Sequence, residues 1–133
     1  MAIRKAMLFL GVASLVGCLS SEPVTTLEGM YPLRSVNGTA LPYVVSQSGG
    51  TKVELIDDAY AIYQGLTFSQ SGHLRTSVNG QSTVANRTNA GNLVLDGNSI
   101  RFRSGTGGAE RLATSQGNTL TVVETDITYV YRN

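Results

Sequence analysis

The sequence has one cysteine and one histidine among its 133 residues, and this scarcity excludes several kinds of site. A single cysteine cannot build a disulfide framework within the chain. A serine–histidine–acid triad would have to use His73, and no Gly-x-Ser-x-Gly elbow is present to hold its serine. We therefore expect His73 to be a solvated residue at the start of a strand. We also expect that the protein is not an enzyme, because no acid–base pair can be placed in one site.

Charged residues are scarce as well, at 14% of the chain, and they form no basic cluster. Beyond Arg4 and Lys5 at the N-terminus, the closest cations, Arg101 and Arg103, have the spacing of a strand, so nothing there attracts nucleic acid. Asp57 and Asp58 could bind a cation, but neighbouring strand residues point to opposite faces, and no EF-hand loop accompanies them. Residues 104–108 are glycine-rich but lack the lysine and the following helix of a phosphate-binding loop. The sequence therefore predicts no metal and no cofactor.

The N-terminal segment has the parts of a secretory signal. Arg4 and Lys5 are followed by residues 6–16, which carry no charge. This apolar run is about half of the roughly 20 residues that a transmembrane helix needs. A signal peptide is therefore a better interpretation than a retained membrane span.

Residues 15–18, Leu-Val-Gly-Cys, resemble the lipobox of bacterial lipoproteins. The resemblance implies cleavage between Gly17 and Cys18 and acylation of Cys18, and two or more acyl chains anchor a protein stably to a membrane. The alternative is an ordinary signal peptide with an incidental cysteine, but a lone thiol in an exported protein invites wrong disulfides, which acylation prevents. Leu19 follows without an aspartate beside it. By the same resemblance, this favours the bacterial outer membrane, with the protein facing the periplasm.

The lipobox divides the chain into three parts. Residues 1–17 are the signal peptide, residues 18–29 a polar, lipid-anchored tether, and residues 30–133 a single domain. The signal removes two of ten Lys and Arg residues, which leaves eight against nine Asp and Glu residues. The mature protein is therefore nearly neutral.

After the signal no segment shows a helical period, whereas alternation with period two is frequent. Ile100 and Phe102, for example, share one face of an expected strand, and Asn37-Gly38 and Asn79-Gly80 are strong turn pairs. Turns every 8–12 residues are typical of an all-β sandwich or barrel. Short links favour an antiparallel up-and-down meander, and closure would remove its unpaired edges. We expect a small, closed or nearly closed barrel of about eight strands, preceded by a signal helix.

The expected strands are short, about 5–7 residues each, as is usual for soluble β domains. Asp57-Asp58 marks a corner, Ser71-Gly72 a turn and residues 87–91 a loop. Gly65, inside the apolar stretch 59–69, indicates a bulge or a sharp bend. Such strands are too short to cross a membrane as a barrel, so their apolar face should point into a core.

Both ends of the domain resemble lipocalin-like bacterial lipoproteins. Residues 31–42, Tyr-Pro-Leu-Arg-Ser-Val-Asn-Gly-Thr-Ala-Leu-Pro, are similar to their opening strand, and residues 117–123 and 128–132 look like their closing strands. Gly29 stands two residues before Tyr31, where lipocalins carry Gly-x-Trp. The resemblance implies a barrel more strongly than it implies a ligand.

Two functions remain open at this point. The first is a carrier that holds a small apolar or amphipathic molecule within the barrel. Its expected lining consists of bulky residues on the inward face: Tyr31, Leu33, Leu55, Phe68, Leu74, Phe102, Leu120 and Tyr129. The second is a filled barrel that binds an envelope protein, as an inhibitor or an assembly partner, and has no small-molecule ligand. A barrel of this size has room either for its own side chains or for one small ligand.

Overall fold

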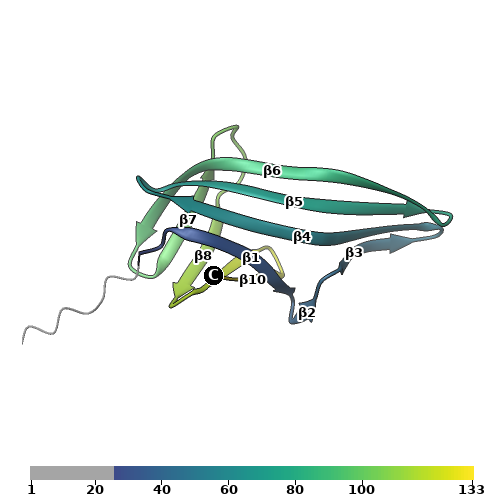
Figure 1. Ribbon diagram of the computed structural model, residues 1–133, viewed down its shortest axis with the longest axis horizontal. Coiled ribbons are helices and arrows are strands. Elements are labelled where there is room, and N and C mark those ends of the chain that lie inside the picture. The colour runs from purple at the N-terminus through teal and green to yellow at the C-terminus, as the bar shows by residue number, and fades with distance from the viewer. Residues whose placement is uncertain (1–25) are drawn as a thin grey trace, which may run out of the picture.

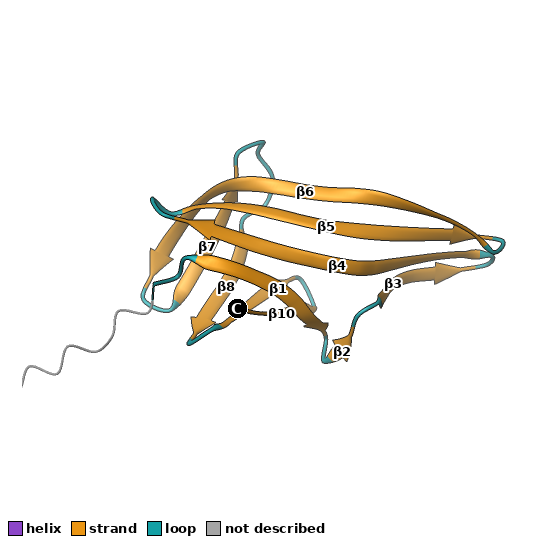
Figure 2. Ribbon diagram, in the orientation of Figure 1, coloured by secondary structure: helices purple, strands orange, loops and turns teal. Residues whose placement is uncertain are grey.

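The structure, a computed structural model, describes residues 26–133, so the signal helix, Gly17 and Cys18 lie outside the described residues. Figure 2 shows only strands and the turns between them in this part of the chain. The strands are β1 (Gly29–Val36), β2 (Thr39–Ala40), β3 (Tyr43–Ser48), β4 (Thr51–Tyr63), β5 (Thr67–Val78), β6 (Gln81–Asp96), β7 (Ser99–Ser104), β8 (Arg111–Gln116), β9 (Thr119–Glu124) and β10 (Ile127–Arg132). The predicted all-β class is confirmed.

Eight of these strands form a closed barrel. Successive strands from β4 to β10 pair antiparallel, and β10 pairs with β1. The ring is closed where β1 pairs with β4, from Gly29 opposite Ile62 to Pro32 opposite Ala59. The short strand β2 pairs with the end of β1, and β3 pairs with β4 outside the ring. The meander and its closure are confirmed, and they give the barrel that the lipocalin-like resemblance implies.

The barrel interior is filled by side chains that alternate inward along the strands. Tyr60 lies at its centre, with its ring centroid 4.6 Å from that of Phe102, 4.9 Å from that of Tyr131 and 5.8 Å from that of Phe68. Such tilted and edge-on ring pairs are favourable beyond the apolar area that they bury. The core cluster comprises Tyr31, Leu33, Val36, Leu55, Tyr60, Ile62, Phe68, Leu93, Ile100, Phe102, Ala113, Leu120, Val122, Tyr129 and Tyr131.

Three strands are much longer than the predicted 5–7 residues: β4 has 13, β5 has 12 and β6 has 16. The predicted corner at Asp57-Asp58, turn at Ser71-Gly72 and loop at residues 87–91 are wrong, because all three lie within these strands. In the register, Asp58 faces Gly72, and Gly72 faces Arg87. The residues that suggested breaks therefore lie side by side on three neighbouring strands, as partners in the strand register.

The structure confirms the bend predicted at Gly65 and the turn predicted at Asn79-Gly80. Gly65, with a φ of 80°, lies in the tight turn between β4 and β5, which confirms the sharp bend expected there. Asn79 and Gly80 have φ angles of 49° and 85° and join β5 to β6 in a two-residue turn. Positive φ at both positions is what this hairpin turn requires.

Beyond the barrel, the long strands continue as a four-stranded sheet with β3 at one border (Figure 1). We call residues 43–48, 51–57, 73–78 and 81–86 the projecting sheet. It leaves the barrel at the end opposite to the start of β1 (Figure 1). At its base Leu55 is buried and Leu74 is packed against the core, whereas farther out the side chains are mostly exposed.

Candidate functional site

The end of the barrel from which the projecting sheet leaves contains a cluster of polar side chains, which we call the polar mouth. Its residues come from five strands: Asp58 and Tyr60 of β4, Gln70 of β5, Arg111 of β8, Glu124 of β9 and Tyr131 of β10. Strand alternation carries them inward, because Asp58 has the parity of Tyr60, and Gln70 that of Phe68. Asp58 and Gln70 are buried as completely as the apolar core.

The polar mouth is a continuous hydrogen-bonded chain. Asp58 Oδ2 accepts from Gln70 Nε2 at 2.5 Å and from the Tyr131 hydroxyl at 2.7 Å. Arg111 Nη1 donates to Gln70 Oε1 at 2.5 Å and to the Tyr60 hydroxyl at 3.0 Å. Arg111 Nε lies 2.6 Å from Glu124 Oε1. The network therefore crosses the barrel from β4 to β9, and buried hydrogen-bond networks of this kind rigidify a core where their members are paired.

Burial sets the protonation of this cluster. It raises the pKa of Asp58, although hydrogen bonds from Tyr131 and Gln70 and the charges of Arg87 and Arg111 oppose the rise. Burial also raises the pKa values of Tyr60 and Tyr131, so both phenols remain protonated; Tyr131 donates to Asp58, whereas Tyr60 accepts from Arg111. The two phenols, the Gln70 amide and the Arg111–Glu124 ion pair therefore have a structural role: they connect the strands around the mouth.

One oxygen of the cluster differs from the others in its hydrogen bonding. Asp58 Oδ1 is buried and has no hydrogen-bond partner among the described residues. A Cβ atom on Gly72 would lie only 2.5 Å from this oxygen and 2.6 Å from the Asp57 carbonyl oxygen. Glycine at position 72 thus leaves the space that Asp58 Oδ1 occupies.

The eight residues predicted to line a ligand cavity are brought together by the fold. Seven of them are buried members of the single core cluster, and Leu74 packs against its border. Phe68 and Phe102 contact each other edge-on, with centroids 4.9 Å apart. The Tyr31 hydroxyl donates to the Leu27 carbonyl at 2.8 Å. These side chains thus occupy the space that they were expected to line; their contact with a ligand stays a prediction.

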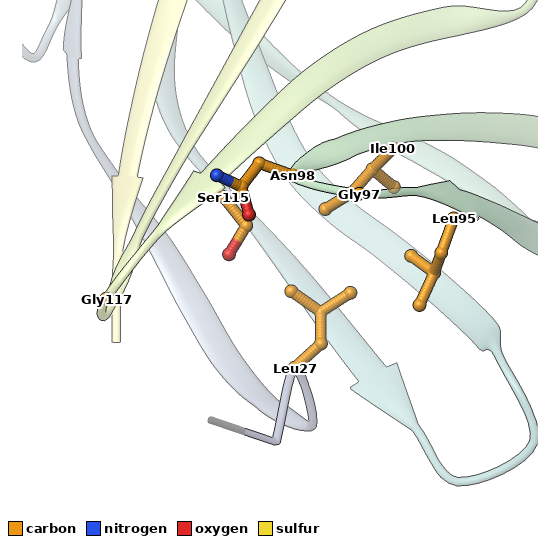
Figure 3. Close-up of a pocket in the computed structure, with 7 residues that line it drawn as sticks. All are labelled: Leu27, Leu95, Gly97, Asn98, Ile100, Ser115 and Gly117. Carbon is orange, nitrogen blue, oxygen red and sulfur yellow. The ribbon is translucent and has the colours of Figure 1, made fainter. Parts of the chain in front are cut away.

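The other end of the barrel has a small pocket. Figure 3 shows Leu27 pointing toward Asn98, Ser115 and Ile100, with Leu95 at the side. The pocket has a volume of about 210 Å³, below the roughly 300–1,000 Å³ of typical small-molecule sites. Three of its lining residues, Gly97, Asn98 and Gly117, lie in turns, and a fourth, Ile100, belongs to the buried core of the filled barrel.

The outer face of the projecting sheet carries ion pairs. His73 Nδ1 lies 2.7 Å from Asp57 Oδ1, and both side chains are about half exposed. His73 is inside β5, so its predicted position at the start of a strand is wrong; alternation brings it opposite Asp57. Farther out, Glu54 lies 2.9 Å from Lys52 Nζ and 2.8 Å from Arg75 Nη2, and these contacts lower the pKa of its carboxyl group.

Sequence reasoning missed the polar mouth. The sequence pattern places Asp58 at a corner and does not single out Gln70 or Arg111, because the pattern considers each residue apart from its cross-strand neighbours. The useful signal was parity, since Asp58 and Gln70 lie two residues from the core aromatics Tyr60 and Phe68. A polar residue in phase with core residues is buried and needs a partner.

No protein-family model matches the chain, and no curated protein or solved structure is significantly similar to it. Within residues 26–133 no helix has the length and apolar character needed to span a membrane. The same residues contain no group of three or more His, Cys, Asp or Glu side chains that could hold a metal ion. The candidate site therefore has to be interpreted from its own geometry.

Proposed function

We propose that this protein is a lipid-anchored lipoprotein of the bacterial cell envelope whose lipocalin-like domain is an interaction module rather than an enzyme. In this function the filled barrel is a rigid support, and the outer surfaces bind an envelope protein. The observation that carries the proposal is the packed interior: Tyr60, Phe102 and Tyr131 are buried against one another, and the polar mouth is closed by hydrogen bonds. A carrier needs that space for its ligand.

The position of the anchor supports the same function. β1 begins at Gly29, at the barrel end opposite to the projecting sheet (Figure 1). With acyl chains on Cys18, the intervening residues 19–28 could reach at most about 36 Å. We propose an outer-membrane location facing the periplasm, with the projecting sheet available to other envelope proteins.

Native mass spectrometry of the full-length lipoprotein, purified in mild detergent from its host, tests the filled barrel. We expect the mass of the acylated protein with no further molecule. An added small apolar molecule that leaves on unfolding would instead support the carrier function. The acyl chains are an internal control, because they are covalent and remain after unfolding.

Metabolic labelling with palmitate tests the anchor separately. Wild-type protein should incorporate the label, and Cys18→Ala should not, because Cys18 is the only thiol in the chain. Labelling of Cys18→Ala would show that the lipobox interpretation is wrong, whatever the barrel contains.

A further inference from the structure

One border of the projecting sheet is an unpaired strand. β6 pairs with β7 only from Gly91 onward, whereas its pairing with β5 begins at Gln81. Residues 81–89 thus have a neighbour on one side alone in the described part of the chain, and Figure 1 shows no strand beside them. We call residues 81–89 the free edge. An unpaired edge of this length is a template for another strand.

The direction of its peptide groups follows from the turn. A two-residue hairpin turn is closed by a hydrogen-bonded pair, here Val78 and Gln81, so the peptide groups of Gln81 point toward β5. Alternation then points those of Ser82, Val84, Asn86 and Thr88 away from β5. The carbonyl of Ala90, next in this series, indeed faces outward and accepts from Gly105 N at 2.8 Å. Each of these four residues therefore offers one N–H donor and one C=O acceptor that have no backbone partner in the described part of the chain.

The opposite border of the same sheet is protected, and this one is not. β3 has six residues, follows Pro42 and is interrupted by a bulge between Val44 and Ser46. Bulges, prolines and lysines are the usual defences of an edge strand. The free edge has no bulge in its pairing with β5, and neither proline nor lysine in its sequence. Its one charged residue is Arg87, which lies in register with Gly72 and Asp58 at the polar mouth.

We infer that the free edge pairs antiparallel with the free edge of a second copy of this chain, about a two-fold axis at Ala85. The inference deepens the proposed function, on which it rests, because it assigns one outer surface and its partner. Four strands from each copy then form one continuous sheet with a barrel at either end. Such strand addition is a recurring way to join β proteins.

The edge is self-complementary in this register. An axis at Ala85 places residue 81 of one copy opposite residue 89 of the other, and so on along the strand. Every outward peptide group therefore meets an outward peptide group of the other copy. That arrangement forms about eight backbone hydrogen bonds, two for each hydrogen-bonded pair. Ala85 faces Ala85 in a non-hydrogen-bonded pair, where strands approach most closely and a small side chain fits. Arg87 of one copy faces Thr83 of the other, so no like charges oppose each other.

Disulfide trapping in the intact lipoprotein, within the envelope of its host, tests this register. In Ala85→Cys the two Cα atoms would lie about 4.5 Å apart, within disulfide range. In Thr83→Cys the two thiols would be four residues out of register, roughly 13 Å apart, which is too far. We expect mild oxidation to give a species of twice the mass for Ala85→Cys. Thr83→Cys should remain monomeric. Val45→Cys, which lies on the protected border formed by β3, should also remain monomeric.

A second variant keeps the test independent of cysteine chemistry. Val84→Pro removes an outward N–H but none of the bonds to β5, so the domain should keep its β-sheet circular dichroism. Added to Ala85→Cys, it should abolish the trapped dimer, whereas Val84→Thr, which retains the N–H, should not. A dimer that persists with Val84→Pro would overturn the pairing.

The remaining outcomes separate this inference from the proposed function. No dimer with Ala85→Cys, or equal trapping at positions 45, 83 and 85, would overturn the inference alone. Trapping of Ala85→Cys to a different envelope protein would overturn the second copy as partner and leave the interaction module standing. Only a small molecule within the barrel, seen by native mass spectrometry, would count against the module itself.

Discussion

The barrel and the projecting sheet are built from the same three strands, yet they are stabilised in different ways. In the barrel, Tyr60 of β4 and Phe68 of β5 are buried among aromatic rings. Farther out, the side chains of β6 are exposed and most of those of β4 and β5 are only partly buried, with cross-strand pairs such as Glu54–Arg75 on the outer face. Apolar burial is worth several kcal/mol per large residue, whereas exposed pairs contribute fractions of that. The barrel therefore holds the sheet in place, and the sheet is free to carry polar residues.

The largest expected contrast is between side chains of the two regions. Phe102→Ala would leave a cavity beside Tyr60 and Phe68, and we expect it to lower the free energy of unfolding by about 3–5 kcal/mol. Val84→Ala, on the projecting sheet with 58% of its surface exposed, should change the free energy by less than about 0.5 kcal/mol. Urea unfolding of the two variants measures both values. Similar losses would contradict the division between a packed barrel and a lightly packed sheet.

The junction of the two regions should be the next most sensitive place. Gly72→Ala would push a methyl group against Asp58 and the Asp57 carbonyl, and overpacking of this kind costs about 1–3 kcal/mol. Gly105→Ala is the matched control, because its nearest neighbour would lie 3.5 Å away and its φ is not positive. Thermal unfolding should show a clear destabilisation for Gly72→Ala alone. If both variants behave alike, the close approach at the junction is not important.

The sequence could predict the barrel because its short strands obey simple rules. Ile100 and Phe102 alternate with arginines, and Tyr129 and Tyr131 share an inward face. All of these signals are local, and hairpin links carry them directly into the meander.

The junction and the polar mouth could not be predicted in the same way. Gly72 and Arg87 resemble loop residues when only their own neighbours in sequence are considered. They lie inside strands because Asp58, Gly72 and Arg87 share one cross-strand row, which depends on the register of strands far apart in sequence. The packed interior depended on the same information, since bulky inward residues can either line a cavity or fill it.

The pH dependence of stability should differ in sign between the two regions. Burial raises the pKa of Asp58 above its ordinary value of 3.8, so its contribution to stability is full below that value and is lost as the pH rises through the folded-state pKa. Hydrogen bonds from Lys52 and Arg75 lower the pKa of Glu54 below 4.5, so its contribution is present above 4.5 and is lost as the pH falls through the lower folded-state pKa.

Two variants separate these effects. Asp58→Asn should gain stability relative to wild type as the pH rises from acid to neutral, because it removes the cost of ionising a buried carboxyl group. Glu54→Gln should lose stability relative to wild type over the same range, because the wild-type ion pairs form there. Urea midpoints across the range give the two slopes, and slopes of the same sign would contradict the assignment.

The smallest expected effects concern single ion pairs of the two regions. Glu124→Gln leaves Arg111 without a charged partner at the half-buried mouth, and we expect a loss of about 1–2 kcal/mol. Asp57→Asn breaks the pair with His73, whose members are about half exposed, so the loss should stay below about 0.5 kcal/mol. High salt should reduce the effect of Asp57→Asn further and change that of Glu124→Gln little, because solvent screens exposed pairs more than covered ones. Equal sensitivity to salt would mean that the polar mouth is as open to water as the projecting sheet.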